Sequence, residues 1–333
     1  MSMKQCIRQI LGSGRPLPIL SFPSVSLIGT DVYTLTHDAA TQADGICAVA
    51  ARTDSAAAVT MMDLSVEAEA FGCEIKAAKN EIPTVVGALV TDEDEADALG
   101  VPEVGAGRTG LYVEAARMAK DRIKDRPVLA GMIGPFSLAG RLMDVSEALV
   151  NCITDPDMVH KTLGKVTPFL IAYAKAFRDA GLDGIVIAEP LSGLLSPALE
   201  AGFSTPYVRE LIASVSSDDF AVIYHNCGPN TPLMTESLKT LGADAYHFGN
   251  AVDITVMLER MGRDTVVCGN IAPSDLFVGG SPDSMRTAVL ALCEKTRAYP
   301  SFVLSSGCDI PPQTPWDNID AFFAAAREAN GVK

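Results

Sequence analysis

The sequence predicts an α/β protein whose parallel strands close into one barrel, and three features of the 333-residue chain lead to this fold class. Short apolar, β-branched runs alternate with longer helical stretches over the whole length, as in repeated strand–helix units. Several of the short runs are almost continuously apolar, which is typical of parallel strands buried on both faces. The length also fits one α/β barrel, a fold that commonly exceeds about 250 residues.

Nine segments are candidate strands. They lie at residues 18–22, 57–62, 84–89, 128–133, 184–188, 221–224, 245–248, 265–268 and 302–305. Helical patterns occupy residues 1–15, 155–180, 200–214, 234–241 and 284–299. The helix at 155–180 has the clearest signals, because Asp155-Pro156 is a typical start and Gly181 a typical stop.

An open, doubly wound sheet is the alternative fold for such alternation. No GxGxxG motif follows a strand and no GxxxxGK[ST] motif occurs, so the usual nucleotide-binding signatures of that fold are missing. No segment resembles a linker between domains. We therefore expect a single barrel domain over residues 1–333, with residues 93–108 as a loop insertion or lid over the barrel mouth.

Charge and composition exclude several classes of function. The net charge of −15 repels nucleic acid. The N-terminal segment lacks the features of a signal peptide, and no apolar run is long enough to span a membrane, so we expect a cytoplasmic protein. The eight cysteines are widely scattered, which is not the pattern of a disulfide framework.

Three residues form a candidate zinc site. His225 and Cys227 follow a predicted strand, and residues two apart on an extended chain point the same way. Cys308 follows the last predicted strand, and the ends of distant parallel strands meet at one mouth of a barrel. An HxC pair alone is a weak signal, which Cys308 strengthens. One imidazole and two thiolates suit zinc.

Further residues are assigned to the site from their positions near strand ends. Glu189 is the candidate for a displaceable fourth zinc ligand and for the catalytic group that takes a proton, with a helix cap or a substrate hydrogen bond as its alternatives. His247, Asn270 and Asp309 are assigned to substrate binding. For His247 the alternative is a structural histidine at the end of a strand.

Four segments of the chain resemble the corrinoid-dependent methyltransferases of the uroporphyrinogen decarboxylase superfamily. They are residues 62–72 (MDLSVEAEAFG), 134–139 (GPFSLA), 225–228 (HNCG) and 307–315 (GCDIPPQTP). The last two are similar to the zinc motifs of that group, although Gln313 replaces a usual glycine. The resemblance implies a uroporphyrinogen decarboxylase-like (β/α)8 TIM barrel whose zinc ligands are His225, Cys227 and Cys308.

The resemblance also implies an activity. In the methylcobamide:coenzyme M methyltransferases, zinc holds a thiol that takes a methyl group from a methylated corrinoid (cobalamin). No DxHxxG corrinoid-binding motif occurs in this chain, so a separate small corrinoid protein is the expected partner of a monomer or homodimer. For a sulfonate-bearing acceptor such as coenzyme M, Arg108 and Arg141 are conceivable partners. Another thiol or a folate remains an alternative acceptor.

Two other functions stay open at this stage. One is a decarboxylase-like enzyme of porphyrin biosynthesis without metal, although residues 22–26 lack the arginine that this branch uses to bind substrate carboxylates. The other is a non-catalytic barrel that binds a corrinoid or a metal. Zinc content and turnover with methylcobalamin and thiols distinguish the three.

Overall fold

Seven parallel strands form the centre of the protein in a computed structural model that describes residues 3–331. Their order in the sheet is β1 (Ala58–Val59), β4 (Val128–Ile133), β5 (Gly184–Ala188), β6 (Ala221–Asn226), β7 (Ala245–Phe248), β8 (Val267–Ile271) and β9 (Phe302–Ser306). All residues of β4, β5 and β6 are buried, as expected for strands covered on both faces. This curled α/β sheet confirms the predicted fold class.

An extended segment at residues 16–19 takes the position of the eighth barrel strand. The Leu17 N–H donates to Leu304 O in β9 at 2.8 Å, and the Ala56 N–H, just before β1, donates to Pro16 O at 2.8 Å. The segment therefore bridges the two edges of the sheet. The prediction of a regular strand at 18–22 is wrong, because Pro16 and Pro18 have no N–H with which to complete a ladder.

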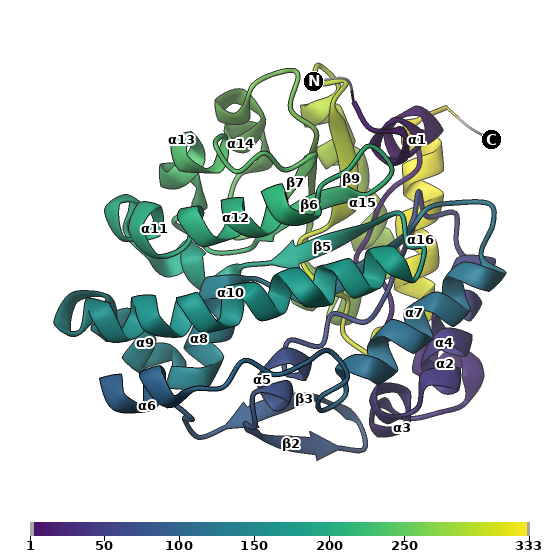
Figure 1. Ribbon diagram of the computed structural model, residues 1–333. Coiled ribbons are helices and arrows are strands. Elements are labelled where there is room, and N and C mark those ends of the chain that lie inside the picture. The colour runs from purple at the N-terminus through teal and green to yellow at the C-terminus, as the bar shows by residue number, and fades with distance from the viewer. Residues whose placement is uncertain (1–2, 332–333) are drawn as a thin grey trace.

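Helices follow most strands and cover the outside of the sheet, with the long helix α10 crossing the front of the view in Figure 1. The helices are α1 (Gln5–Ser13), α2 (Ser24–Ile28), α3 (Val32–His37), α4 (Ala39–Arg52), α5 (Val66–Ala70), α6 (Glu93–Ala98), α7 (Thr109–Arg122), α8 (Pro135–Met143), α9 (Val145–Thr154), α10 (Pro156–Asp179), α11 (Pro197–Phe203), α12 (Thr205–Val215), α13 (Thr235–Leu238), α14 (Ile254–Met261), α15 (Pro282–Thr296) and α16 (Trp316–Ala329). Shorter helical turns lie at Pro190–Leu194, Thr231–Met234 and Pro273–Val278. The helix predicted at 155–180 is confirmed as α10, which Asp155 caps through its side chain.

Two further predicted elements differ from the structure. The strand expected at 84–89 is instead β3 (Glu81–Val86), which pairs antiparallel with β2 (Glu74–Ala78) in a separate hairpin at the lower edge of Figure 1. The helix expected at 200–214 is divided into α11 and α12. The division coincides with Pro206 in the first turn of α12, where a proline is tolerated although it cannot continue a preceding helix.

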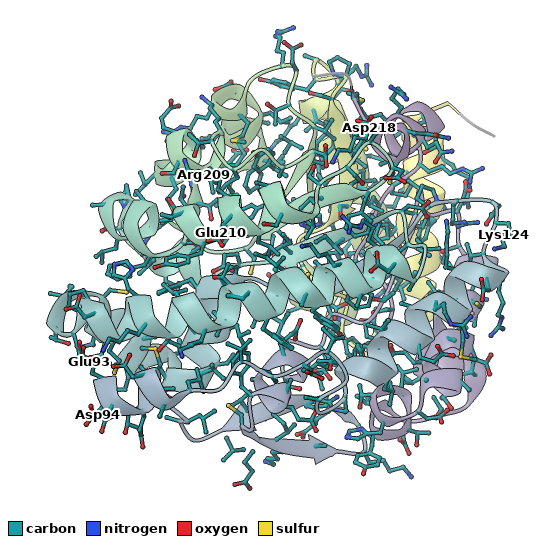
Figure 2. The ribbon with its side chains drawn as sticks, in the orientation of Figure 1. Glu93, Asp94, Lys124, Arg209, Glu210 and Asp218 are labelled. Carbon is teal, nitrogen blue, oxygen red and sulfur yellow. The ribbon has the colours of Figure 1, made fainter. Side chains whose placement is uncertain are left out.

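Charged side chains lie on the outside of this architecture. Figure 2 shows Glu93 and Asp94 at the start of α6 and Arg209 and Glu210 on α12, all exposed. Within residues 3–331, no helix combines the length and the apolar composition that crossing a membrane requires.

Candidate metal centre

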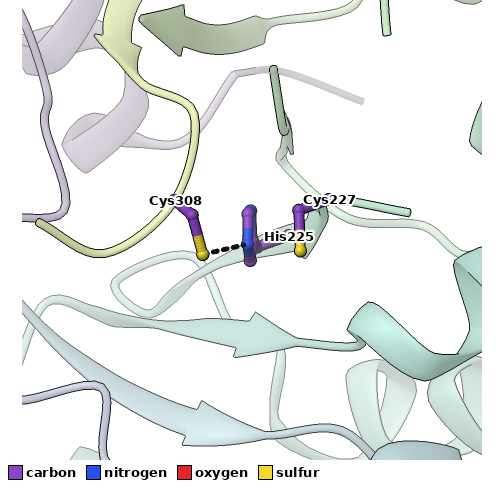
Figure 3. A group of neighbouring side chains, drawn as sticks. All are labelled: His225, Cys227 and Cys308. Carbon is purple, nitrogen blue, oxygen red and sulfur yellow. Dashed lines mark hydrogen bonds between the residues drawn. The ribbon is translucent and has the colours of Figure 1, made fainter. Parts of the chain in front are cut away.

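The side chains of His225, Cys227 and Cys308 meet at the carboxyl end of the barrel strands. His225 lies in β6, Cys227 directly follows that strand, and Cys308 lies two residues beyond the end of β9. One ligand atom from each residue lies within 4.8 Å of the other two. Figure 3 shows the two sulfurs on either side of the imidazole. The geometry brings together the three residues that the sequence motifs single out.

A cavity of about 240 Å³ opens beside these three side chains. Most of its wall is apolar, with Met62, Leu64, Ala188 and Pro190 among the contributors. Residues 82–85 of strand β3 form another part of the wall, so the hairpin covers the barrel mouth at this point. A reactive group in this cavity would therefore be partly shielded from water.

The two thiols influence each other's ionisation. A hydrogen bond between them lowers the pKa of Cys227, and the same bond together with burial raises the pKa of Cys308 to about 12. The Cys308 Sγ also lies 3.6 Å from His225 Nε2. Without a metal, one thiolate is thus favoured over two, and binding a metal to both sulfurs would release protons.

A second histidine, His247, contacts the ring of His225. His225 Nδ1 is 2.7 Å from His247 Nδ1, and His247 Nε2 is 2.7 Å from Ser305 Oγ. Burial lowers the pKa of His247 well below its ordinary value, so this ring is neutral. His247 was assigned to substrate binding, but its ring contacts His225 and it is not among the residues lining the cavity.

Glu189 follows β5 and is fully buried. Its Oε1 accepts a hydrogen bond from the Ser137 N–H at 2.9 Å, at the start of α8, while Oε2 has no partner among the described residues. Burial raises the pKa of Glu189 to about 8. Its carboxylate is not part of the group of three ligand atoms. Its roles as fourth ligand and proton acceptor stay predictions, and the first of them requires the side chain to move toward the three residues.

The other two residues assigned to substrate binding have different surroundings. Asp309 lines the cavity, and neither carboxylate oxygen has a hydrogen-bond partner in the described part of the chain. Asn270 is not among the lining residues, since its amide donates to Gly249 O at 3.0 Å and to Val252 O at 2.9 Å. Asn270 therefore holds the loop after β7.

The two candidate arginines differ in their contacts with carboxylates. The Arg108 guanidinium is buried and contacts the carboxylates of Asp63 at 2.7 Å and Glu69 at 2.6 Å. Arg141, in the last turn of α8, lines the cavity and has no carboxylate within 4.0 Å among residues 3–331. Burial lowers the pKa of Arg141. Arg141 is thus the cation available to a molecule in the cavity.

Gly249 and Ser305 are parts of the site that sequence reasoning missed. A Cβ atom on Gly249 would lie 2.4 Å from the Cβ of Cys227, so only glycine allows this close approach. Ser305 and Ser306 interrupt an otherwise apolar, buried strand, which is a signal that the sequence offered.

Most of the sequence matches a known protein family. The uroporphyrinogen decarboxylase (URO-D) family matches residues 24–329. A methylcobamide:CoM methyltransferase MtbA of Methanosarcina acetivorans is 28% identical over 269 residues, covering 80% of this chain and 77% of that protein. A uroporphyrinogen decarboxylase of Coxiella burnetii is 26% identical, covering 81% of this chain and 76% of that protein.

Solved structures show the same fold. A methyltransferase from Methanosarcina mazei has a TM-score of 0.85 at 24% identity and covers 98% of this chain and 99% of its own. A B12-independent methionine synthase from Shewanella has a TM-score of 0.62 at 14% identity, covering 87% of this chain and 88% of its own. The family match spans almost the whole barrel, and on that ground the chain belongs to the uroporphyrinogen decarboxylase (URO-D) family.

Proposed function

We propose that this protein is a zinc-dependent methyltransferase that moves a methyl group from a methylated corrinoid to a thiol. The observation that carries the proposal is the convergence of His225, Cys227 and Cys308, with one ligand atom each inside 4.8 Å, beside an apolar cavity. The methyltransferases of Methanosarcina to which the chain is similar are named for methylcobamide and CoM, and this likeness supports the same reaction class.

The three side chains fit zinc by the chemistry of their donor atoms. Zinc accepts thiolate sulfur and imidazole nitrogen, and catalytic zinc sites combine three protein ligands with one exchangeable position. The cavity beside the three residues leaves room for a ligand at such a position. When bound, zinc supplies the positive charge that keeps a coordinated thiol deprotonated near neutral pH.

The residues of the cavity provide the surroundings in which the methyl group is transferred. The proposed reaction forms a carbon–sulfur bond and breaks a carbon–cobalt bond, whose electron pair stays on cobalt. The apolar wall around Met62 and Leu64 excludes water and so favours the thiolate as the nucleophile. The methyl donor reaches the cavity on a separate corrinoid protein, because this barrel has no corrinoid-binding motif of its own.

The acceptor is a small thiol with an anionic group, of which coenzyme M is an example. Arg141 supports this choice, because a desolvated guanidinium without a carboxylate partner is costly unless an anion pairs with it. The fork of donors on arginine matches a sulfonate or carboxylate. In this arrangement the sulfur faces Cys227 and Cys308 while the anionic end pairs with Arg141.

Turnover tests the function. Zinc-loaded protein is mixed with methylcobalamin and mercaptoethanesulfonate, and the cobalt spectrum is followed over time. We expect thiol-dependent demethylation that disappears when a chelator removes the zinc and returns when zinc is restored. A metal-free protein that demethylates equally well would exclude the proposal, and a zinc-loaded protein without turnover would favour a binding role.

The acceptor is tested with a pair of thiols that differ in charge. Arg141→Met should raise the KM for mercaptoethanesulfonate about 10- to 100-fold, the range of a charged hydrogen bond of about 1.5–3 kcal/mol. The KM for neutral mercaptoethanol should stay the same. Equal effects on both thiols would contradict the pairing of Arg141 with the anionic group.

A further inference from the structure

A chain of four buried hydrogen-bonding groups runs from the candidate zinc ligand to the backbone. Ser305 Oγ lies 2.6 Å from Leu17 O and 2.7 Å from His247 Nε2. His247 Nδ1 lies 2.7 Å from His225 Nδ1, and His225 Nε2 faces Cys308 Sγ. The side chains of His225, His247 and Ser305 are at most 2% exposed. Water therefore has little access to this chain of contacts.

The positions of the hydrogens along this chain follow from its backbone end. The Leu17 carbonyl only accepts, so the single hydroxyl hydrogen of Ser305 is directed to it. Ser305 Oγ must then accept from His247, which places the hydrogen of that ring on Nε2. The Nδ1 of His247 is left with a lone pair.

The tautomer of His225 follows from that of His247. A doubly protonated His247 would be a buried cation, and the side-chain partners of the two rings within the described residues are each other, Ser305 and Cys308, none of which is a carboxylate. With His247 neutral, the hydrogen between the two Nδ1 atoms belongs to His225. The opposite arrangement would bring two lone pairs together at 2.7 Å. His225 Nε2 consequently carries a lone pair on the side of the two cysteines.

We infer that His247 and Ser305 are positioning residues that hold His225 in its Nδ1–H tautomer and present its Nε2 lone pair to a metal. This series of hydrogen bonds ends on the Leu17 carbonyl and not on a carboxylate. It therefore orients His225 without adding negative charge. This matters at a site that already holds two thiolates. The inference rests on the proposed function only for the identity of the metal.

Nitrogen NMR on metal-free, 15N-labelled protein tests the tautomers directly. The chain has four histidines, so the long-range proton–nitrogen correlations of their rings can be assigned with one variant each. We expect the hydrogen on Nδ1 in His225 and on Nε2 in His247. A hydrogen on Nε2 of metal-free His225 would overturn the inference, whether or not the protein binds zinc.

Zinc affinity, measured by competition with a chromophoric chelator, tests the positioning role. His247→Leu removes the acceptor of the His225 hydrogen and should weaken zinc binding about 10- to 100-fold, as the loss of such outer partners does elsewhere. His247→Asn offers an amide oxygen near the former Nδ1 and should restore much of the affinity. His160→Leu, at an exposed histidine outside the site, is the matched control and should bind zinc like the natural protein.

If circular dichroism shows that His247→Leu does not fold, Ser305→Ala provides a second test of the positioning role. It should weaken zinc binding and mix the His225 tautomers in the NMR spectrum. Natural affinity in Ser305→Ala with unchanged tautomers would overturn the inference. If the natural protein binds no zinc at all, the proposed function fails, and the NMR result still decides whether His247 and Ser305 fix His225.

Discussion

Glu189 is the residue whose proposed role depends most on a change in its contacts. Its Oε1 is held by the Ser137 N–H, and a Cβ on Gly134 would lie 1.5 Å from its Oε2, so the side chain fills the space that this glycine leaves. Its own N–H donates to His225 O at 2.9 Å, which links it to the strand of the candidate metal site. The carboxyl group is therefore close to the site through the backbone but directed away from it.

Replacing Glu189 by glutamine tests its role in taking the proton of the thiol. Only the deprotonated carboxylate accepts a proton, and the pKa of Glu189 is about 8, so its contribution should grow as pH rises through this value. Glu189→Gln should therefore weaken the rise of thiol affinity with pH. Glu67→Gln is the control, because Glu67 is equally buried and its pKa is also raised to about 8. Identical pH profiles for Glu189→Gln and the natural protein would end this hypothesis.

At the residue scale, the sequence identified the three candidate ligands but not their surroundings. The HxC motif begins in the last residues of β6 and the GCD motif follows β9, and the two-residue alternation of an extended chain directs His225 and Cys227 to the same side. The role of Arg141 depends on the lack of a carboxylate partner among residues 3–331, and that of Ser305 depends on the partner that its side chain reaches. Leu17 lies far from Ser305 in the sequence, and only the folded chain reveals such relations.

At the scale of elements, the loops at the carboxyl ends of the strands control the position of Cys227. The loop after β7 packs Gly249 against the Cβ of Cys227, and Asn270 in β8 holds this loop through two backbone carbonyls. The loop after β6 is thus supported from a neighbouring strand end. The precise separation of the ligand atoms depends on this packing.

The variant Gly249→Ala should displace Cys227, since its new Cβ would lie 2.4 Å from the Cβ of the cysteine, well inside ordinary van der Waals contact. We expect a loss of stability of about 1–3 kcal/mol, as for other overpacked sites, and a zinc affinity about 10-fold weaker. Thermal unfolding and chelator competition measure the two effects. Gly202→Ala is the control, because a Cβ there meets no atom within 4 Å. Natural zinc affinity in Gly249→Ala would show that this packing does not position the ligand.

The sequence predicted strands well where both faces are buried and poorly elsewhere. The prediction at 128–133 coincides with β4, all of whose residues are buried. The segment around β3 has a similar apolar composition but belongs to a half-exposed hairpin. Pairing direction depends on distant partners that composition does not encode. The hairpin nevertheless belongs to the candidate site, because its residues 82–85 line the cavity.

At the scale of the whole molecule, the barrel places acidic groups in an apolar interior. Burial raises the pKa of both Glu67 and Glu189 to about 8 from an ordinary value of 4.5. Between these values the folded chain holds protons that the unfolded chain has lost. The contribution of these two carboxyl groups to the free energy of unfolding should therefore fall as pH rises from about 4.5 to about 8. The single buried, neutral His247 contributes in the opposite sense below its ordinary pKa of 6.5.

Thermal unfolding across this pH range measures the effect. The Tm of the natural protein should fall with rising pH, and Glu67→Gln should reduce the slope because glutamine has no proton to lose. Glu259→Gln, at an exposed position of α14, should leave the slope unchanged. An identical slope in Glu67→Gln and the natural protein would show that the Glu67 carboxyl is not kept protonated by folding.

Barrel closure was predicted from strand number, but the way it is achieved was not. The alternation of strands and helices indicated eight or nine strands, while the barrel sheet of the described residues has seven strands and an irregular segment at 16–19. The prolines that prevent a regular strand there are visible in the sequence. Their effect depends on the two neighbouring edges, which become neighbours only when the barrel closes.

X-ray absorption at the zinc edge would detect a zinc ion that holds a thiol between His225, Cys227 and Cys308. The zinc-loaded protein should show two sulfurs at about 2.3 Å and one imidazole nitrogen at about 2.0–2.1 Å. Addition of mercaptoethanesulfonate should bring a third sulfur at a similar distance. Zinc surrounded only by nitrogen and oxygen, or a sulfur count that the thiol does not change, would contradict the account.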